Sequence, residues 1–300
     1  MINIKNVSKE FEGISAIENI SMDIKAGEIF GLVGTNGSGK STLLRMVAGV
    51  LKPDSGEVLY DGKSVYENTE VKSNICFLAD TGYMPGSATP NDMAKTYKIF
   101  YPDFDKKRFT EYLKKIGLDE KRKMRTFSKG MKKQVSVILG ICTNTKVLLC
   151  DETFDGLDPV MRQTVKSIFA TEMLDRDFTP IIASHNLREL EDICDNIGFL
   201  HNGKVIYSSS LEQLRLGIQK IQCVLNDTGK EQQLMGRLKV IKSKKNGSML
   251  TIVARGERKD ILSVVNEYSP AFAEAMPLSL EEIFIDEMEV SGYDFKDIFS

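Results

Sequence analysis

The hydrophobic pattern of this 300-residue chain predicts two kinds of strand. The run Val147–Cys150 is apolar at every position, which is typical of a parallel sheet that is covered on both faces. Further short apolar runs predict strands at 29–33, 75–79 and 180–183. Residues 2–7 and 20–25 instead alternate apolar and polar positions, which predicts two strands around a loop at 9–13. The first half of the chain therefore combines two kinds of sheet.

Helical periodicity lies between and after these strands. Residues 88–124 are expected to be mainly helical, and Phe109, Tyr112, Leu113 and Ile116 mark one amphipathic helix. Ser128 is placed to cap the next helix, and Pro159 suits the first turn of a helix at 159–174. A hairpin is expected at 197–207, turning on Asn202-Gly203.

The signals weaken after about residue 216. Alternating runs at 221–225, 237–242 and 249–253, with helices near 257–267 and 279–289, predict a small α+β appendage. We therefore expect an α/β domain at 1–215, with a mostly parallel core sheet, an N-terminal antiparallel β subdomain and a helical insertion at about 85–143. The appendage would occupy residues 216–300.

Composition indicates the partners and the compartment of the protein. The formal net charge is −2, so the global basic field that attracts nucleic acid is missing, and no nucleic-acid partner is expected. The five cysteines form no C-x-x-C pair, which favours reduced thiols in a cytosolic protein. No run approaches the roughly 18 apolar residues of a membrane span, so another chain would supply one.

Candidate chemistry begins at Gly34, where the pattern G-x-x-x-x-G-K-S follows an apolar strand and precedes an apolar-periodic helix. Its glycines let backbone N–H groups turn inward around a phosphate at a helix N-terminus. Lys40 would reach the β- and γ-phosphates, and the Ser41 hydroxyl would hold Mg²⁺. The alternative is a glycine-rich turn with a chance lysine, but the flanking strand and helix favour a nucleotide site. The expected phosphate cradle includes Asn36, Gly37, Ser38, Gly39, Lys40, Ser41 and Thr42.

Three more candidates follow later strands, where open α/β sheets place their ligand chemistry. Asp151 and Glu152 end the strand at 147–150, and His185 follows the strand at 180–183. Hydrolysis of a nucleotide needs a metal ligand, a group that activates water and a sensor near the γ-phosphate. Asp151, Glu152 and His185 fit these roles in that order. Taken singly, an acidic pair is often a helix cap and a lone histidine is often structural, but their shared position favours catalysis.

Together these motifs resemble the nucleotide-binding subunit of an ATP-binding cassette (ABC) transporter, over residues 1 to about 212. Residues 127–131, Phe-Ser-Lys-Gly-Met, match the family's signature loop, and Gly156-Leu157-Asp158 matches its dimer-contacting loop. The resemblance implies an ATPase in which two subunits sandwich two ATP molecules. Ser128 and Gly130 would then act on the ATP of the other subunit, Asp158 would contact the dimer partner, and Phe11 would stack on adenine.

The chain departs from the family pattern at three places. Asp80 replaces the usual glutamine after the strand at 75–79, and it is our third candidate metal ligand beside Ser41 and Asp151. Lys129 and Met131 replace a glycine and a glutamine of the signature loop, and Gln134 replaces a common arginine. Because Lys40, Asp151, Glu152 and His185 are all present, hydrolysis is expected.

Residues 100–105 and 279–284 resemble bacterial cassette subunits of the antibiotic- and peptide-export type. This resemblance implies export of a peptide, antibiotic or lipid-like compound, with a separate transmembrane permease and a homo- or heterodimer of cassettes. The chain would lie in the cytoplasm, on the inner face of the cell membrane. The alternatives are a soluble cassette ATPase acting on ribosomes or DNA, which usually carries two cassettes or a long coiled coil, and a small GTPase, for which the Asn-Lys-x-Asp motif is missing.

Overall fold

The computed structural model describes residues 1–276 and 278–290, which divide into two compact units. The first unit ends at Ser208 and the second begins at Ser209, not at the expected boundary of 215/216. The reason is α8 (Leu211–Gly217), which packs against β11 and α11 of the second unit. Within the described residues, no helix has the length and apolar character needed to cross a membrane.

The first unit contains an antiparallel sheet with the strand order β2-β1-β4-β5. Its strands are β1 (Ile2–Phe11), β2 (Ile14–Ile24), β4 (Ser55–Tyr60) and β5 (Lys63–Ser64). The predicted loop at 9–13 was wrong, because the β1–β2 pairing continues to Phe11 and Ile14 and leaves only Glu12-Gly13 as the turn. The Asp54 carboxylate accepts from the Glu10 backbone N–H at 2.8 Å, a tertiary contact that the local sequence does not reveal.

The second sheet of this unit has six strands in the order β10-β9-β3-β8-β7-β6. They are β3 (Phe30–Val33), β6 (Ile75–Leu78), β7 (Val147–Asp151), β8 (Thr179–Ser184), β9 (Asn196–His201) and β10 (Lys204–Ser210). The pairs β3–β8, β3–β9, β7–β8 and β6–β7 are parallel, as the unalternating apolar runs predict. The hairpin turn at Asn202-Gly203 is also confirmed.

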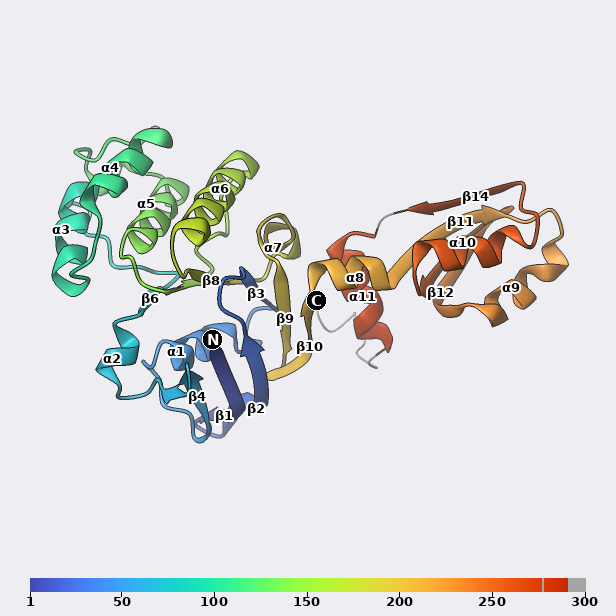
Figure 1. Cartoon of the computed structure of the whole chain (residues 1–300), viewed down its shortest axis with the longest axis horizontal. Helices are drawn as coiled ribbons and strands as arrows, with labels where there is room; N and C mark the ends of the chain where they lie inside the picture. Colours follow the sequence, from blue (N-terminus) through green and yellow to red (C-terminus); the bar gives the residue numbers. More distant parts are fainter. Residues whose placement is uncertain (277, 291–300) are drawn as a thin grey trace. The chain divides into compact units, whose positions relative to one another are not determined.

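Helices cover this sheet and form the insertion (Figure 1). The core between the two sheets buries Leu43 and Met46 of α1 (Lys40–Val47) against Val7 and Leu149. The helical region contains α3 (Pro90–Phe100), α4 (Lys106–Lys115), the 3₁₀ turn η1 (Met124–Thr126) and α5 (Lys129–Ile141). The remaining helices of the unit are α2 (Thr69–Lys72), α6 (Pro159–Asp175) and α7 (Leu187–Ile193).

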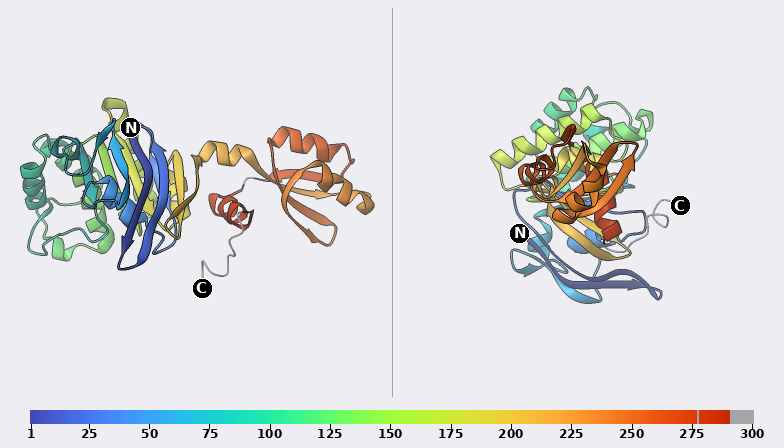
Figure 2. Two further views of the ribbon diagram at one scale, coloured as in Figure 1. Left: turned by 90° about the horizontal axis from the view of Figure 1, so that it is seen from below. Right: turned by 90° about the vertical axis from the view of Figure 1, so that its right-hand side faces the viewer.

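The second unit is a four-stranded antiparallel sheet with the order β12-β13-β11-β14. Its chain order is β11 (Ile218–Val224), η2 (Thr228–Lys230), α9 (Glu231–Arg237), β12 (Lys239–Asn246), β13 (Met249–Arg255), α10 (Arg258–Asn266) and β14 (Phe272–Met276). This βαββαβ order is that of a ferredoxin-like fold. Leu234 of α9 and Ile261 of α10 share a core with the strands. Figure 2 shows the ribbon of this unit, in orange and red, from two further sides. The helix α11 (Leu280–Val290) follows. Sequence analysis predicted the α+β class but missed α8, α9 and β14.

All five cysteines are free, and all are buried. Burial raises the pKa of the Cys76 thiol to about 11, so the thiol form dominates at neutral pH. This confirms the prediction of reduced thiols in apolar surroundings.

Candidate functional site

The phosphate loop connects the buried strand β3 to α1 and requires glycine at two positions. A Cβ on Gly34 would lie 2.3 Å from the carbonyl oxygen of Leu200. This atom belongs to the backbone, which cannot move aside as the end of a flexible side chain can. Gly39 has a φ of +104°, and a Cβ there would lie 2.6 Å from the carbonyl oxygen of Ala16. Gly37 also has a positive φ but faces open space. The loop is therefore fixed at its ends and open at its middle, where a phosphate would enter.

Lys40 lies across this loop and is almost fully buried. Its Nζ donates to the carbonyl oxygens of Gly34 and Thr35, at 2.7 and 3.0 Å. Burial lowers the pKa of Lys40, and the carboxylates of Glu152 and Asp151 counteract this shift. An ammonium group held inside a glycine-rich loop is the arrangement that binds the terminal phosphates of a nucleotide.

Ser41 and Asp151 meet at the end of β7. The Ser41 hydroxyl donates to Oδ1 of Asp151 at 2.9 Å, although the two residues are 110 positions apart. Burial raises the pKa of Asp151, while the hydrogen bond from Ser41 lowers it. A hydroxyl and a carboxylate are oxygen donors of the kind that Mg²⁺ prefers, so this pair fits the predicted metal site.

Glu152 lies between two cationic or protonatable groups. Its Oε1 is 3.8 Å from Nζ of Lys40 and 3.7 Å from Nδ1 of His185. The Glu152 backbone has a φ of +48°, in the left-handed region that non-glycine residues rarely adopt. Its N–H donates to the carbonyl oxygen of Ala183 at 2.9 Å, which ties the end of β7 to β8. The structure thus brings Lys40, Ser41, Asp151, Glu152 and His185 together, as the sequence predicts.

The other predicted site residues lie outside this group. Ser128 caps α5, accepting from the backbone N–H of Met131 at 3.1 Å, and Asp158 caps α6, accepting from Met161 at 2.9 Å. Phe11 is 45% exposed, with Nζ of Lys9 5.4 Å from its ring centroid. Within the described part of the chain, Ser128, Gly130 and Asp158 make no hydrogen bond or ion pair with the five grouped residues. Their roles in a dimer stay predictions.

Asp80 is also engaged elsewhere. Its Oδ1 lies 3.4 Å from Nζ of Lys133, a residue of α5 that sequence analysis did not select. The Lys133 ammonium also donates to the backbone carbonyl oxygen of Glu152 at 2.6 Å. The one sequence signal for this contact is the unusual aspartate after β6, which places a negative charge where the family pattern has a neutral glutamine.

Sequence analysis also missed a buried acid pair behind His185. Asp155 has Oδ2 3.0 Å from Nδ1 of His185, and its Oδ1 accepts from the Ser184 hydroxyl at 2.8 Å. Burial, a hydrogen bond with Asp155 and the charge of Asp155 raise the pKa of Glu189 to about 7. His185 is therefore held by an acid on the loop after β7, and the pairing depends on folding, so no local signal marks it.

Comparison with known proteins places this site in a family context. The sequence profile described as ABC transporter matches residues 17–155. The ABC transporter ATP-binding protein YtrB of Bacillus subtilis is 31% identical over 95% of this chain and 97% of its own length. The methionine import ATP-binding protein MetN of Carboxydothermus hydrogenoformans is 34% identical over 69% of this chain and 65% of its own length. The lantibiotic transport ATP-binding protein SrtF of Streptococcus pyogenes is 29% identical over 71% of this chain and 95% of its own length.

The fold comparison agrees. A dimeric, post-hydrolysis structure of the ATP-binding cassette MJ0796 bound to ADP and Pi matches 70% of this chain and 99% of its own, with a TM-score of 0.62. Its sequence identity is 23%, so this likeness establishes the fold.

Proposed function

The chain belongs to the ABC transporter family of ATP-binding subunits, and we propose that its site hydrolyses ATP with Glu152 as the base that activates water. One observation supports this assignment above all. The Glu152 carboxylate lies between the phosphate-loop ammonium of Lys40 and the imidazole of His185, at 3.8 and 3.7 Å. A carboxylate at this place is within reach of a water molecule in line with a γ-phosphate that Lys40 holds.

The remaining roles follow the same arrangement. Residues Asn36 to Thr42 surround the phosphates with backbone N–H groups, and exposed Phe11 offers a face for adenine stacking. Ser41 and Asp151 would hold Mg²⁺, which would neutralise charge on the phosphates. We assign Asp80 to positioning instead of direct metal binding, because its carboxylate pairs with Lys133.

The site is completed by a second cassette subunit. Ser128 and Gly130, at the start of α5, and Asp158, at the start of α6, lie on exposed or half-exposed loops with no link to Lys40 or Glu152 among the described residues. Helix N-termini that present N–H groups and a hydroxyl suit a γ-phosphate. We propose that these residues close over the ATP bound by the partner subunit.

We further propose that the chain drives export of a peptide, antibiotic or lipid-like compound through a separate transmembrane permease. The likeness to a lantibiotic transport protein over 95% of that protein's length favours this class of cargo. The chain would then lie on the inner face of the cell membrane, attached through the permease. The likeness to a methionine import protein makes the direction of transport the point to test.

The first experiment measures steady-state ATP hydrolysis by the purified chain against protein concentration, beside Glu152→Gln. Turnover that rises more than linearly with concentration and falls at least 100-fold in the variant is expected, since general-base catalysis contributes about 10²–10⁴-fold. Turnover unaffected by Glu152→Gln would refute the assignment of the base. Tight ATP binding without turnover would show that a different partner subunit is required.

A second experiment tests direction. Membrane vesicles from cells that contain the chain and its native permease are prepared inside-out and right-side-out, and each is supplied with ATP and either a fluorescent lantibiotic or radiolabelled methionine. Lantibiotic uptake by inside-out vesicles supports export. Methionine uptake by right-side-out vesicles with ATP enclosed would refute it.

A further inference from the structure

Lys133 connects the helical region to the edge of the parallel sheet at two points. Its Nζ donates to the backbone carbonyl oxygen of Glu152 at 2.6 Å and lies 3.4 Å from Oδ1 of Asp80. The side chain of Lys133 is 22% exposed, so water competes with these contacts only in part. One ammonium group therefore bridges α5, the loop after β6 and the residue after β7.

The carbonyl that Lys133 binds belongs to a residue with an unfavourable backbone. Glu152 has a φ of +48°, and this left-handed conformation is unfavourable for a residue with a Cβ. Such a conformation persists only where its surroundings hold it. Three hydrogen bonds hold the Glu152 backbone: its N–H donates to the Ala183 carbonyl, and its carbonyl accepts from the Lys133 ammonium at 2.6 Å and, at a longer 3.3 Å, from the Asp155 N–H.

The direction of this peptide also sets the direction of the side chain. Rotation of the Glu152 backbone out of the left-handed region would swing its Cβ away from Lys40 and His185, which now lie 3.8 and 3.7 Å from the carboxylate. Because a misplacement of about 1 Å can slow catalysis about 100-fold, a bond that fixes this peptide bears on the rate.

Asp80 gives Lys133 a reason to stay in place. A lysine side chain has four rotatable bonds and a strong preference for water, so a single carbonyl holds it weakly. The Asp80 carboxylate, 47% exposed, adds a charge–charge attraction to the same ammonium. The charge that distinguishes Asp80 from a glutamine is thus matched by the charge of Lys133.

We propose that Lys133 is a positioning residue for ATP hydrolysis, which holds the Glu152 peptide in its left-handed conformation, and that Asp80 in turn holds Lys133. The proposal rests on the role of Glu152 as the base. It makes the start of α5, close behind the signature loop, a direct determinant of where the catalytic carboxylate points.

The chain offers a matched control next to Lys133. Lys132 lines the same cavity of about 360 Å³ together with Asp80, Lys129 and Lys133. In the part of the chain that the structure describes, the Lys132 ammonium makes no hydrogen bond or ion pair, and only the backbone of Lys132 is engaged, its N–H donating to the Ser128 carbonyl at the start of α5. Lys132→Met therefore removes a charge from the same cavity without removing the contact to Glu152.

The test compares kcat for ATP hydrolysis and the Kd for MgATP in full-length Lys133→Met, Lys133→Arg, Asp80→Asn and Lys132→Met. We expect Lys133→Met to lower kcat about 10–100-fold while Kd changes less than about threefold, because the carbonyl contact affects geometry and not phosphate binding. Arginine should restore at least about a third of kcat, since it retains the donor and charge. Asp80→Asn should lower kcat about three- to tenfold, and its combination with Lys133→Met should be no worse than Lys133→Met alone.

Equal losses in Lys132→Met and Lys133→Met would overturn the proposal, because they would reflect the charge of the cavity. Additive losses in the double variant would overturn the part assigned to Asp80. Asp80 is exposed enough that Asp80→Asn should fold even if Lys133→Met does not.

A crystal structure of each protein with a non-hydrolysable ATP analogue separates this proposal from the proposed function. A Glu152 peptide that leaves the left-handed region in Lys133→Met, but not in Lys132→Met, supports positioning even if the isolated chain does not hydrolyse ATP. An unchanged Glu152 peptide and carboxylate in Lys133→Met refutes positioning, whatever Glu152→Gln does to turnover.

Discussion

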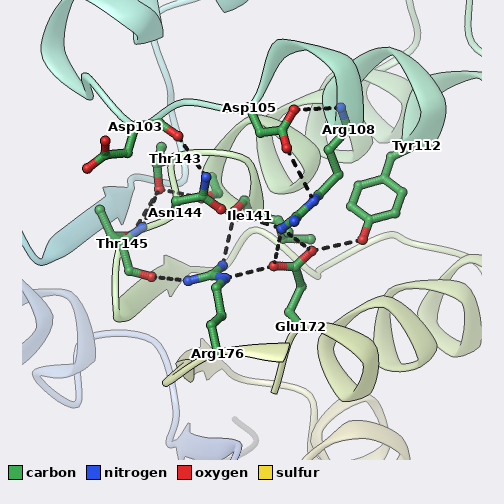
Figure 3. A network of polar contacts seen from close by, with 11 residues as sticks. Asp103, Asp105, Arg108, Tyr112, Ile141, Thr143, Asn144, Thr145, Glu172 and Arg176 are labelled. Carbon is green, nitrogen blue, oxygen red and sulfur yellow. Dashed lines mark hydrogen bonds and ion pairs between the residues drawn. The ribbon is translucent and has the colours of Figure 1, made fainter. Parts of the chain in front are cut away.

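Replacing the buried Glu172 by alanine should destabilise the first unit more than removing a carboxylate from its surface does. Glu172 lies on α6, its side chain is 1% exposed, and its carboxylate joins α6 to α4 (Figure 3). Arg108 donates to its two oxygens at 3.0 and 2.9 Å, Arg176 donates at 2.7 Å, and the Tyr112 hydroxyl donates at 2.8 Å. Burial and the hydrogen bond to Glu172 raise the pKa of Tyr112, so this hydroxyl acts as a donor at neutral pH.

The cost follows from the burial of each partner. Removing one member of a buried ion pair costs about 3–5 kcal/mol, because the remaining charge loses its partner without regaining full hydration. Arg108 and Arg176 are 30% and 18% exposed, so water reaches both in part and the lower end applies, about 3 kcal/mol. For a unit of this size, about 3 kcal/mol lowers the melting temperature by roughly 6–12 °C.

The assay is differential scanning calorimetry of the full chain with and without MgATP. The transition that moves upward with MgATP belongs to the unit that binds it, because a ligand stabilises only the state to which it binds. Two control variants give smaller losses of stability for comparison. Tyr112→Phe removes one donor and should cost about 1 kcal/mol. Glu70→Ala removes the surface pair with Lys63, whose side chains are 57% and 75% exposed, and should cost less than about 1 kcal/mol.

If Glu172→Ala lowers the melting temperature of the first unit no more than Glu70→Ala does, the reasoning is refuted. It would mean that the two guanidinium groups recover their hydration fully, or that the carboxylate stabilises nothing beyond its desolvation cost.

Two further predictions concern the site. Gly34→Ala should abolish measurable MgATP binding in calorimetric titration, because its Cβ would lie 2.3 Å from the Leu200 carbonyl oxygen. A Cβ on Gly37 faces open space, so Gly37→Ala should lower the free energy of unfolding by only about 1 kcal/mol, the cost of its positive φ. Glu189 has its pKa raised to about 7 in the folded chain from 4.5, so the folded state binds the extra proton and stability falls as pH rises through this range. Urea unfolding should show that the free energy of unfolding of the wild type falls by on the order of 2 kcal/mol more than that of Glu189→Gln between pH 5 and pH 8. An equal fall in the two proteins would contradict the raised pKa of Glu189.

The parts of the site that sequence could predict are those fixed by local chemistry. The apolar run before Gly34 predicts a buried strand, and parallel strands end at one edge, so Asp151, Glu152 and His185 were expected near Lys40. Ser128 was predicted to cap a helix and does so, whereas the cap that Asp158 forms on α6 was not predicted. These inferences need only the pattern within each segment and the rule that parallel strands end at one edge.

The contacts that sequence could not predict depend on residues far apart in the chain. Lys133 looks like any lysine of an amphipathic helix, and its acceptor is a backbone atom 19 residues away that only the left-handed Glu152 exposes. In the second unit, β14 reads Phe-Ala-Glu-Ala-Met, which has weak strand propensity and becomes a strand by pairing with β11. The ferredoxin-like order likewise follows from pairings that alternation alone does not specify.

The helix α5 is bound to the rest of the first unit at both of its ends. At the start of the helix Lys133 binds the Glu152 carbonyl, and at its end the Ile141 carbonyl accepts from Arg176, which also binds Glu172. Both ends of α5 are therefore tied to the rest of the first unit, one at Glu152 and one, through Arg176, at the buried Glu172 carboxylate that also binds α4. A rotation of α5 relative to the core would therefore strain both the Lys133–Glu152 and the Arg176–Ile141 hydrogen bonds. On the proposed function, a movement of residues 127–131 at the start of α5 would thus reach the backbone of Glu152, the proposed base.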